Sequence, residues 1–430
     1  MRILWTRAAA DAQAVPDSPS QRPSGGSQQA LVALQYFLYF GVFAIYLPYF
    51  NLYCYHLGFS GVQIGVLSAL RSVALVTFAL LWGALADRFQ CRRGIFILCS
   101  LAATAVWSAY LTTERFVPML AITVAHALFF APLISFLEAF SMDVLGARKQ
   151  RYGSLRVWGS IGFILVVLAI GRLLENRPVN LIVVLILGGS AVQAVFALAL
   201  PRSASKPVQH RWQGAEAMRQ LRLWLFLGGA FLMLVSHGAY YGFFSIHLEV
   251  AGFSKSFIGM AWALASTAEI GVMIRSEALF GRFSLPKVLV FSMAVAVLRW
   301  LLVWIALSPA AILATQVLHA VTYGTFHMAS ILFVDRLMPE AAKTSGQALN
   351  NAVTYGLGNM VGFFLNGYLF EIMGTRPLFL VSAGIALAGG LLMAAALRFQ
   401  LDYSGVDKVL ARKRDKANDE DHESGGQGRF

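Results

Sequence analysis

Residues 58–65 read GFSGVQIG and residues 252–259 read GFSKSFIG, so the pattern Gly-Phe-Ser-x-x-x-Ile-Gly occurs twice, 194 residues apart. The same offset aligns GALADRF at 83–89 with EALFGRF at 277–283. Self-similarity at nearly half the chain length indicates that one long unit was duplicated. With one residue of slippage the alignment continues and pairs Trp107 with Trp300 and His126 with His319.

The repeated unit is mostly apolar. Hydrophobic residues make up 58% of the chain and charged residues only 13%, and the mean hydropathy is +0.66. A soluble domain averages about 25% charged residues, so this composition is typical of a membrane protein. Runs long enough to cross a bilayer as helices occur twelve times, at 31–53, 61–85, 94–112, 116–138, 155–174, 179–200, 222–247, 257–279, 287–307, 310–334, 345–370 and 377–399.

The duplication and the apolar runs together predict an all-α membrane protein with twelve transmembrane helices in two pseudo-symmetric six-helix bundles. Such internal repeats are typical of transporters with a central site between related halves. We expect the bundles at 30–200 and 222–400, joined by a basic linker at 201–221. The polar segments 1–29 and 401–430 have the composition of disordered tails.

The net charge of +13 follows the topology of the chain. If the N-terminus is cytoplasmic, 26 of the 34 Lys and Arg residues fall in cytoplasmic tails and loops and 5 in the opposite loops. This asymmetry is the positive-inside rule, and it places both termini in the cytoplasm. The basic charge therefore requires no nucleic-acid partner. The remaining three cations lie within or at the edge of spans and are Arg71, Arg156 and Arg299.

The loop at 83–89, followed by Arg92 and Arg93, resembles the signature loop of the major facilitator superfamily, and 277–283 is its degenerate copy in the matching loop. Gln90 departs from the family pattern, which has glycine there, so the turn can differ in shape.

We expect this loop to act as a conformational latch. Glycine at 83 would let two helices approach closely, and Asp87 could accept hydrogen bonds from a neighbouring helix N-terminus. Arg88, Arg92 and Arg93 would hold the cytoplasmic face. The alternative is that these charges serve topology alone, although an aspartate adds nothing to a positive-inside bias.

Further segments resemble the phenylpropionate permease group, which is related to lactose-permease-type proton symporters. They are YGSLRVWGS at 152–160, HGAYYGF at 237–243, Leu298-Arg299-Trp300, Gln316-x-Leu318-His319, GQAL at 346–349 and YGLG at 355–358. The resemblance implies that a carboxylate in span 4 pairs with an arginine in span 5, and that charged groups of spans 8 to 10 handle the proton. It departs from lactose permease after His319, where no second carboxylate follows. The matching residues are Glu138, Arg156, Glu269, Arg299 and His319.

Charges within spans are costly and usually face a cavity or a partner. Glu138 and Arg156 lie near span ends, where they either snorkel to the interface or line a cavity. Arg71, Glu269 and Arg299 lie nearer mid-span, which favours a functional or buried-pair role.

Polar and aromatic groups on three spans are the other candidate substrate contacts. In span 10, Gln316, His319, Tyr323 and His327 follow a helical stripe that favours a wet, cavity-lining face. Tyr46 belongs to an aromatic stripe on span 1, and the repeat relates this stripe to span 7. Such stripes also arise from packing, but a tyrosine hydroxyl seeks a polar partner. The span 7 candidates are His237, Tyr240 and Tyr241. We interpret His126 as packing and Pro132 as a kink in span 4.

These features predict a secondary transporter of the bacterial inner membrane that takes up a small organic acid, with aromatic acids as candidates, together with protons by alternating access. The intramembrane charges leave a surplus of one positive charge, for which a substrate carboxylate is a suitable partner. Sugar or nucleoside symport and drug efflux remain alternatives, and a membrane enzyme or a non-transporting sensor is a distant one. We expect no metal, no cofactor, no enzymatic activity and a monomer in the bilayer.

We expect Glu269 to bind and release the coupled proton, with Arg299 and His319 poising its carboxyl group for this exchange. Burial favours the protonated carboxyl and a neighbouring arginine favours the carboxylate, so the balance could place the exchange near physiological pH. The alternative is a fixed structural ion pair between spans 8 and 9.

Overall fold

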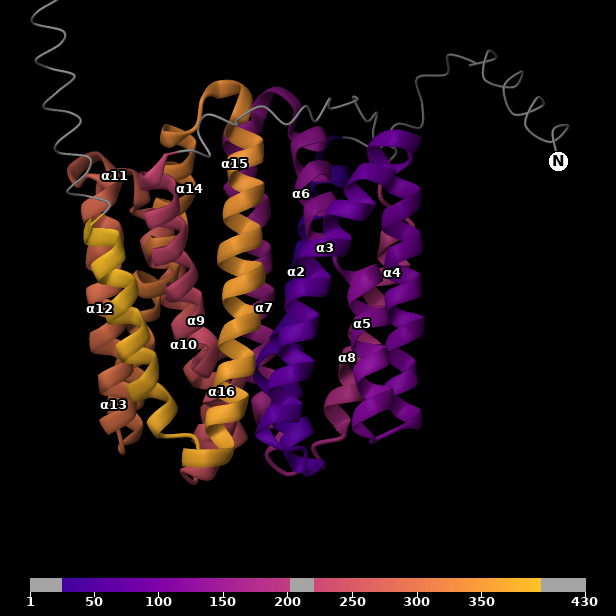
Figure 1. Ribbon diagram of the computed structural model, residues 1–430. Helices are drawn as coiled ribbons and strands as arrows, with labels where there is room; N and C mark the ends of the chain where they lie inside the picture. The colour runs from indigo at the N-terminus through magenta and orange to yellow at the C-terminus, as the bar shows by residue number, and fades with distance from the viewer. Residues whose placement is uncertain (1–24, 202–219, 396–430) are drawn as a thin grey trace, which may run out of the picture.

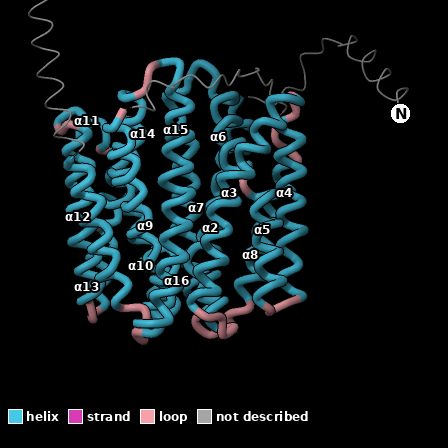
Figure 2. The backbone as a smooth tube through the Cα atoms, in the orientation of Figure 1, coloured by secondary structure: helices cyan, strands magenta, loops and turns pink. Residues whose placement is uncertain are grey.

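The computed structural model describes residues 25–201 and 220–395. Its helices run side by side between two faces (Figure 1), and the loops gather at these two ends (Figure 2). We call the end where α2 (Gly25–His56) begins and α3 (Gly61–Phe89) ends the basic face. The other end, where α2 ends and α3 begins, is the opposite face.

The two stretches of chain each form one half of the bundle. The first half continues with α4 (Arg92–Ser108), η2 (Ala109–Thr112), α5 (Phe116–Phe130), α6 (Pro132–Leu145), η3 (Gly146–Arg151), α7 (Tyr152–Leu174) and α8 (Leu181–Ala197). The second half contains α9 (Leu221–Val250), α10 (Lys255–Ile274), α11 (Ser276–Arg282), α12 (Leu285–Ile305), α13 (Pro309–Val317), η5 (Ala320–Thr325), α14 (Phe326–Leu337), η6 (Glu340–Ala342), α15 (Lys343–Asn350), η7 (Asn351–Gly358), α16 (Asn359–Met373) and a last helix, Pro377–Ala395.

Each of the twelve predicted spans overlaps a described helix, the last one up to Ala395. Ten described helices are long and apolar enough to cross a membrane. The two others are α8, which is 17 residues long, and the continuous coil of α15, η7 and α16. Because α2 begins at Gly25, residues 25–29, which we expected in the N-terminal tail, are helical. Residues 1–24, 202–219 and 396–430 lie outside the described part of the chain.

The duplication is visible in local geometry. Gly58 and Gly252 both have positive φ, at 79° and 87°, a conformation that glycine adopts without a Cβ clash. The serine two residues later caps the next helix in both halves. Ser60 accepts a hydrogen bond from the backbone of Gln63, and Ser254 accepts one from Phe257.

Pro132 divides span 4 into α5 and α6, as predicted. Proline has no N–H, so the carbonyl of Leu128 four residues earlier loses its helical donor. The indole Nε1 of Trp82 on α3 donates to that carbonyl at 2.7 Å. The kink therefore keeps its backbone satisfied through a neighbouring helix, as a membrane span requires.

Spans 10 and 11 each contain a π-helical stretch, η5 and η7. Such stretches insert an extra residue into the helical turn and often occur at functional sites. η5 lies between His319 and His327, so the stripe predicted at regular α-helical spacing is shifted along this span.

The halves meet along three helix pairs, α3 with α16, α7 with α10, and α2 with α9. Within the halves, α2 packs against α7 and α8, and α9 packs against α16. The helices α2, α3, α7, α9, α10 and α16 therefore surround the molecular centre.

Candidate functional site

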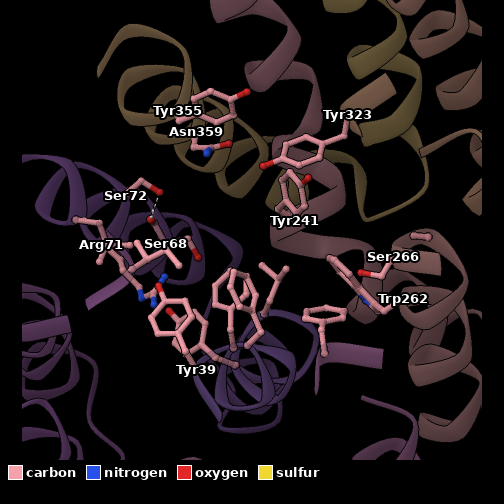
Figure 3. A pocket seen from close by; sticks show the side chains of 18 of the residues that line it. Tyr39, Ser68, Arg71, Ser72, Tyr241, Trp262, Ser266, Tyr323, Tyr355 and Asn359 are labelled. Atoms are coloured by element: carbon pink, nitrogen blue, oxygen red, sulfur yellow. Dashed lines mark hydrogen bonds between the residues drawn. The ribbon is translucent and has the colours of Figure 1, made fainter. Parts of the chain in front are cut away.

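A cavity of about 530 Å³ lies between the two halves. In Figure 3, Arg71, Ser68 and Ser72 face the cavity from one side, and Tyr241, Tyr323 and Trp262 face it from the other. Further lining residues come from both halves, among them from α2, α5, α6, α7, α10 and α16. They include Tyr39, Phe40, Phe43, Tyr46, Asn51, Phe130, Arg156, Ser160, Phe163, Ser266, Glu269, His319, Tyr355, Asn359 and Phe363.

Arg71 is the buried cation of the first-half wall. Its guanidinium lies 3.9 Å from the ring centre of Tyr46 and 5.5 Å from that of Phe130, within the range of cation–π attraction. Its Nε is buried without a hydrogen-bond partner. Among the described residues no carboxylate forms an ion pair with Arg71. It therefore presents an uncompensated positive charge to the cavity.

Arg156 lines the same wall from α7, with its guanidinium 4.1 Å from the ring centre of Phe40. Glu138 on α6 is exposed and does not line the cavity. In the described part of the chain no ion pair joins the two residues, although they interact electrostatically.

Glu269, His319 and Arg299 form a chain of hydrogen bonds on the second-half wall. Oε1 of Glu269 lies 2.9 Å from Nε2 of His319. Nδ1 of the same ring lies 2.8 Å from Nη1 of Arg299. Glu269 and His319 line the cavity, whereas Arg299 is fully buried. Glu269 and Arg299 are thus bridged by the imidazole.

The donor chemistry of arginine determines the state of His319. A guanidinium has N–H donors and no acceptor, so Nδ1 of His319 must accept from Arg299. The imidazole is then neutral and carries its proton on Nε2. This N–H donates a hydrogen bond to the carboxylate of Glu269. This order of bonds links the carboxylate to the buried cation through a single ring.

Several second-half candidates lie behind the cavity wall. Gln316 is fully buried and accepts from Nη2 of Arg299 at 3.3 Å. Tyr240 places its ring 4.3 Å from the guanidinium carbon of Arg299. Nδ1 of His237 donates to the carbonyl of Met233 at 2.8 Å, and its Nε2 is buried without a hydrogen-bond partner among the described residues. Neither Tyr240 nor His237 lines the cavity. These residues surround Arg299 and the hydrogen-bonded chain of Glu269, His319 and Arg299, which we call the relay.

Aromatic rings cover the same wall toward the cavity. Tyr323 stacks on His319 and on His327, with ring centres 5.3 Å and 6.0 Å apart. His327 does not line the cavity, but its Nδ1 bonds the hydroxyl of Tyr355, which does. Tyr241 packs edge-on against Tyr323 at 5.8 Å.

Comparison with known proteins decides the family. The model of the MFS_1 like family matches residues 30–381. This chain belongs to that family. It is therefore a secondary transporter of the major facilitator superfamily, a multi-pass membrane protein with a small-molecule substrate, and it is not an enzyme.

The transporter is similar to curated proteins along most of its length. It is 27% identical over 368 residues to the probable 3-phenylpropionic acid transporter of Escherichia coli (strain K12), covering 83% of this chain and 94% of that one. It is 25% identical over 332 residues to the uncharacterized transporter YwbF of Bacillus subtilis (strain 168), covering 77% and 83%. It is 25% identical over 352 residues to the maltose permease of Geobacillus stearothermophilus, covering 80% and 88%.

Solved structures agree on the fold of the transporter. The nucleoside transporter NupG has a TM-score of 0.75 and 18% identity, covering 86% of this chain and 99% of NupG. A bacterial homologue of the human lysosomal transporter Spinster has a TM-score of 0.69 and 16% identity, covering 89% and 99%.

The signature loop of the transporter lies on the basic face. Gln90 adopts a left-handed φ of 50° at the end of α3, so the turn keeps the conformation that glycine would favour. Arg92 pairs with Asp143 at 3.0 Å. Arg93 donates to the carbonyls of Leu198 and Leu200. Arg88 lies over the ring of Phe89.

Two other candidate latch residues belong to the last turns of α3. Among the described residues, no side chain and no neighbouring helix lies within 4 Å of a Cβ built on Gly83, so in this conformation no close helix contact uses this glycine. Asp87 offers its backbone carbonyl to the side chain of Gln90.

Several cavity residues of the transporter are absent from the sequence-based candidates. Trp262 and Ser266 on α10 and Asn359 on α16 are examples. Ser68 and Ser72 could have been found, because they lie three residues before and one residue after Arg71 on α3 and flank its face. Asn51 donates to Ser68 and to the carbonyl of Gly242 in the other half, both at 3.0 Å.

Proposed function

We propose that the transporter takes up a small organic monocarboxylate with an aromatic or other apolar body, in symport with protons. The two halves, 30–200 and 222–400, would rock about the cavity so that it opens to one side of the membrane at a time. The linker at 201–221 would lie in the cytoplasm.

Arg71 carries the proposal for substrate charge. A buried guanidinium that lacks a carboxylate partner is costly, and a bound carboxylate would compensate it. Ser68 and Ser72 lie beside it on the cavity wall and supply further hydroxyl groups. The tyrosine, tryptophan and phenylalanine rings of both walls suit an apolar substrate body.

Glu269 is the proposed proton site. Its side chain remains 23% accessible and lines the cavity, while His319 connects it to the buried Arg299. Protonation of Glu269 would remove a negative charge from a cavity that also holds the substrate carboxylate. Occupancy of one site therefore changes the affinity of the other, which is the thermodynamic basis of coupling.

The relatives include a transporter named for a carboxylate and others named for different substrates. One relative is named for 3-phenylpropionic acid, another for maltose and another for nucleosides. The uncompensated Arg71 favours the acid, since a neutral sugar or nucleoside would leave its charge unpaired.

The experiment is uptake into proteoliposomes with an imposed inward proton gradient. We expect accumulation of 3-phenylpropionate or a related acid, and we expect a protonophore to abolish it. Maltose and uridine serve as neutral competitors. Accumulation of a neutral solute with no response to organic acids would contradict the proposal. Proton-driven export of the same acids would instead establish efflux.

The charge distribution supports the proposed location. The excess of Lys and Arg on one side of the predicted topology would place the basic face in the cytoplasm. The transporter would reside in the inner membrane of a bacterium as a monomer. Gly83, Asp87, Arg88, Arg92 and Arg93 would form a latch when the cavity closes on that side. Topology reporters fused after residue 395 and after residue 305 would test the orientation.

A further inference from the structure

The two halves touch most closely near the opposite face. A Cβ built on Gly65 would lie 2.6 Å from the carbonyl oxygen of Phe363, and one on Gly367 would lie 2.5 Å from that of Gly61. On the other side of the molecule, a Cβ on Gly259 would lie 2.6 Å from the carbonyl of Val167. Only glycine permits such contacts between helix backbones.

Each glycine contact has a carboxylate one turn away. Glu371 follows Gly367 by four residues on α16, and its Oε1 accepts from the backbone N–H of Val62 at 3.4 Å. Glu175 follows Gly171 by four residues at the end of α7. Its Oε2 accepts from the backbone N–H of Ser256 at 2.9 Å and from the hydroxyl at 2.8 Å. Both acceptors sit at a helix N-terminus, where backbone N–H groups are free and the dipole favours an anion.

The two arrangements are copies of one another through the duplication. Val62 and Ser256 occupy the same place in the repeated Gly-Phe-Ser-x-x-x-Ile-Gly pattern, directly after Gly61 and Lys255. Gly171-x-x-x-Glu175 and Gly367-x-x-x-Glu371 form a second repeat, 196 residues apart. Gly171-x-x-x-Glu175 of the first half contacts the Gly-Phe-Ser-x-x-x-Ile-Gly segment of the second half. Gly367-x-x-x-Glu371 of the second half contacts the same segment of the first half. We call these two contacts the seams.

We infer that Glu175 and Glu371 are gate residues, which hold the cavity closed at the opposite face and must release the helix N-termini of α10 and α3 each time it opens there. Among the described glycines, those whose built Cβ would lie within 3.0 Å of the other half all lie between the cavity and that face, and they are Gly61, Gly65, Gly171, Gly259 and Gly367. A contact between Nε2 of His56 and the carboxylate of Glu249 joins α2 to α9 beside them.

The cavity-lining charges lie on the basic side of these seams. Arg71 follows Gly65 along α3, and Glu269 follows Gly259 along α10. Opening at the opposite face would separate both seams together, because they lie between the same two halves. The carboxylates therefore bias the equilibrium between the two orientations of the cavity. This role is independent of which substrate is carried.

Side-specific cysteine labelling tests the inference. In a background with Cys54, Cys91 and Cys99 replaced, Ser266→Cys places a reporter thiol in the cavity. A membrane-impermeant maleimide is applied to right-side-out and to inside-out vesicles of the parent, of the Glu175→Gln/Glu371→Gln pair and of Glu114→Gln. Glu114 is an exposed carboxylate between η2 and α5, at the opposite face and outside the seams.

We expect the double variant to label about three-fold to thirty-fold faster than the parent from the opposite face, since two charge–dipole contacts are lost. Glu114→Gln should label like the parent. Labelling from the basic face reports that the variant is folded with its cavity intact. Restoring one carboxylate should return part of the effect. Equal opposite-face labelling in the double variant, the parent and Glu114→Gln would overturn the inference.

Discussion

Nε2 of His319 lies 2.9 Å from Oε1 of Glu269, and the opposite nitrogen of the same ring faces Nη1 of Arg299. The arginine can only donate, so the ring must donate to the carboxylate. A change of protonation at Glu269 therefore reaches a fully buried guanidinium through one imidazole. This arrangement differs from the direct ion pair that the sequence left open.

Replacement of Glu269 by glutamine tests proton coupling. Glutamine keeps the size and hydrogen bonding of the side chain and removes the titrating group. We expect Glu269→Gln to lose accumulation against a gradient and to retain downhill exchange, measured in proteoliposomes with and without an imposed pH gradient. If the variant still concentrates substrate in response to protons, Glu138 becomes the next candidate for the proton site.

His319 and His126 are equivalent in the duplication and form a matched pair for a stability test. His319→Leu would leave buried donors of Arg299 without their acceptor, and we expect a loss of about 2–4 kcal/mol. The ring of His126 stacks on Phe130 and meets Trp107 edge-on, and among the described residues no hydrogen bond or ion pair joins it to a charged side chain. His126→Leu should therefore cost much less in thermal unfolding in detergent. Equal losses at both positions would argue against the relay.

Arg71 should determine affinity for the substrate carboxylate. Loss of a charged hydrogen bond costs about 1.5–3 kcal/mol, so Arg71→Gln should weaken binding of the acid by about ten-fold to a hundred-fold. The uncharged amide analogue of the acid serves as control, because its binding should change little. Tryptophan fluorescence titration measures both affinities. A parallel loss for acid and amide would indicate a structural role.

Gly259 and Gly271 lie on the same helix and allow a clean test of the seams. A Cβ at 259 would meet the backbone of Val167, whereas nothing lies within 4 Å of one at 271. Gly259→Ala should force the opposite face apart and slow turnover, while Gly271→Ala should leave transport unchanged. Double electron–electron resonance between spin labels on α7 and α10 would measure the separation.

Acid on the opposite face should leave the Glu175 contact intact at moderate pH. Hydrogen bonds from the backbone and hydroxyl of Ser256 hold the pKa of Glu175 below its usual range. Because this pKa is lowered in the folded protein, the contact stabilises the closed opposite face fully above the ordinary glutamate pKa of about 4.3. The stabilisation is lost only as the pH falls through the lowered pKa. Opposite-face labelling of the parent, corrected for thiol reactivity, should therefore stay constant from pH 8 to pH 6.

The sequence alone determined the twelve helices, the duplication, the kink at Pro132 and the set of charges within the spans. These features depend on local hydropathy and on residue chemistry, which can be read along one chain. The resemblance to lactose-permease-type symporters placed Glu269, Arg299 and His319 in one group, and the cost of intramembrane charge separately indicated partners for Glu269 and Arg299.

Only the tertiary structure decided which candidates face the cavity and in what order the charges are bonded. Tyr240 and Gln316 share spans with cavity residues, yet they lie behind the wall, where both contact the buried guanidinium of Arg299. Likewise, nothing local marks Glu175 or Glu371 as gate candidates. Their hydrogen-bond partners lie 81 and 309 residues away along the chain. Only the packing of the two halves brings each carboxylate to the N-terminus of a helix in the opposite half.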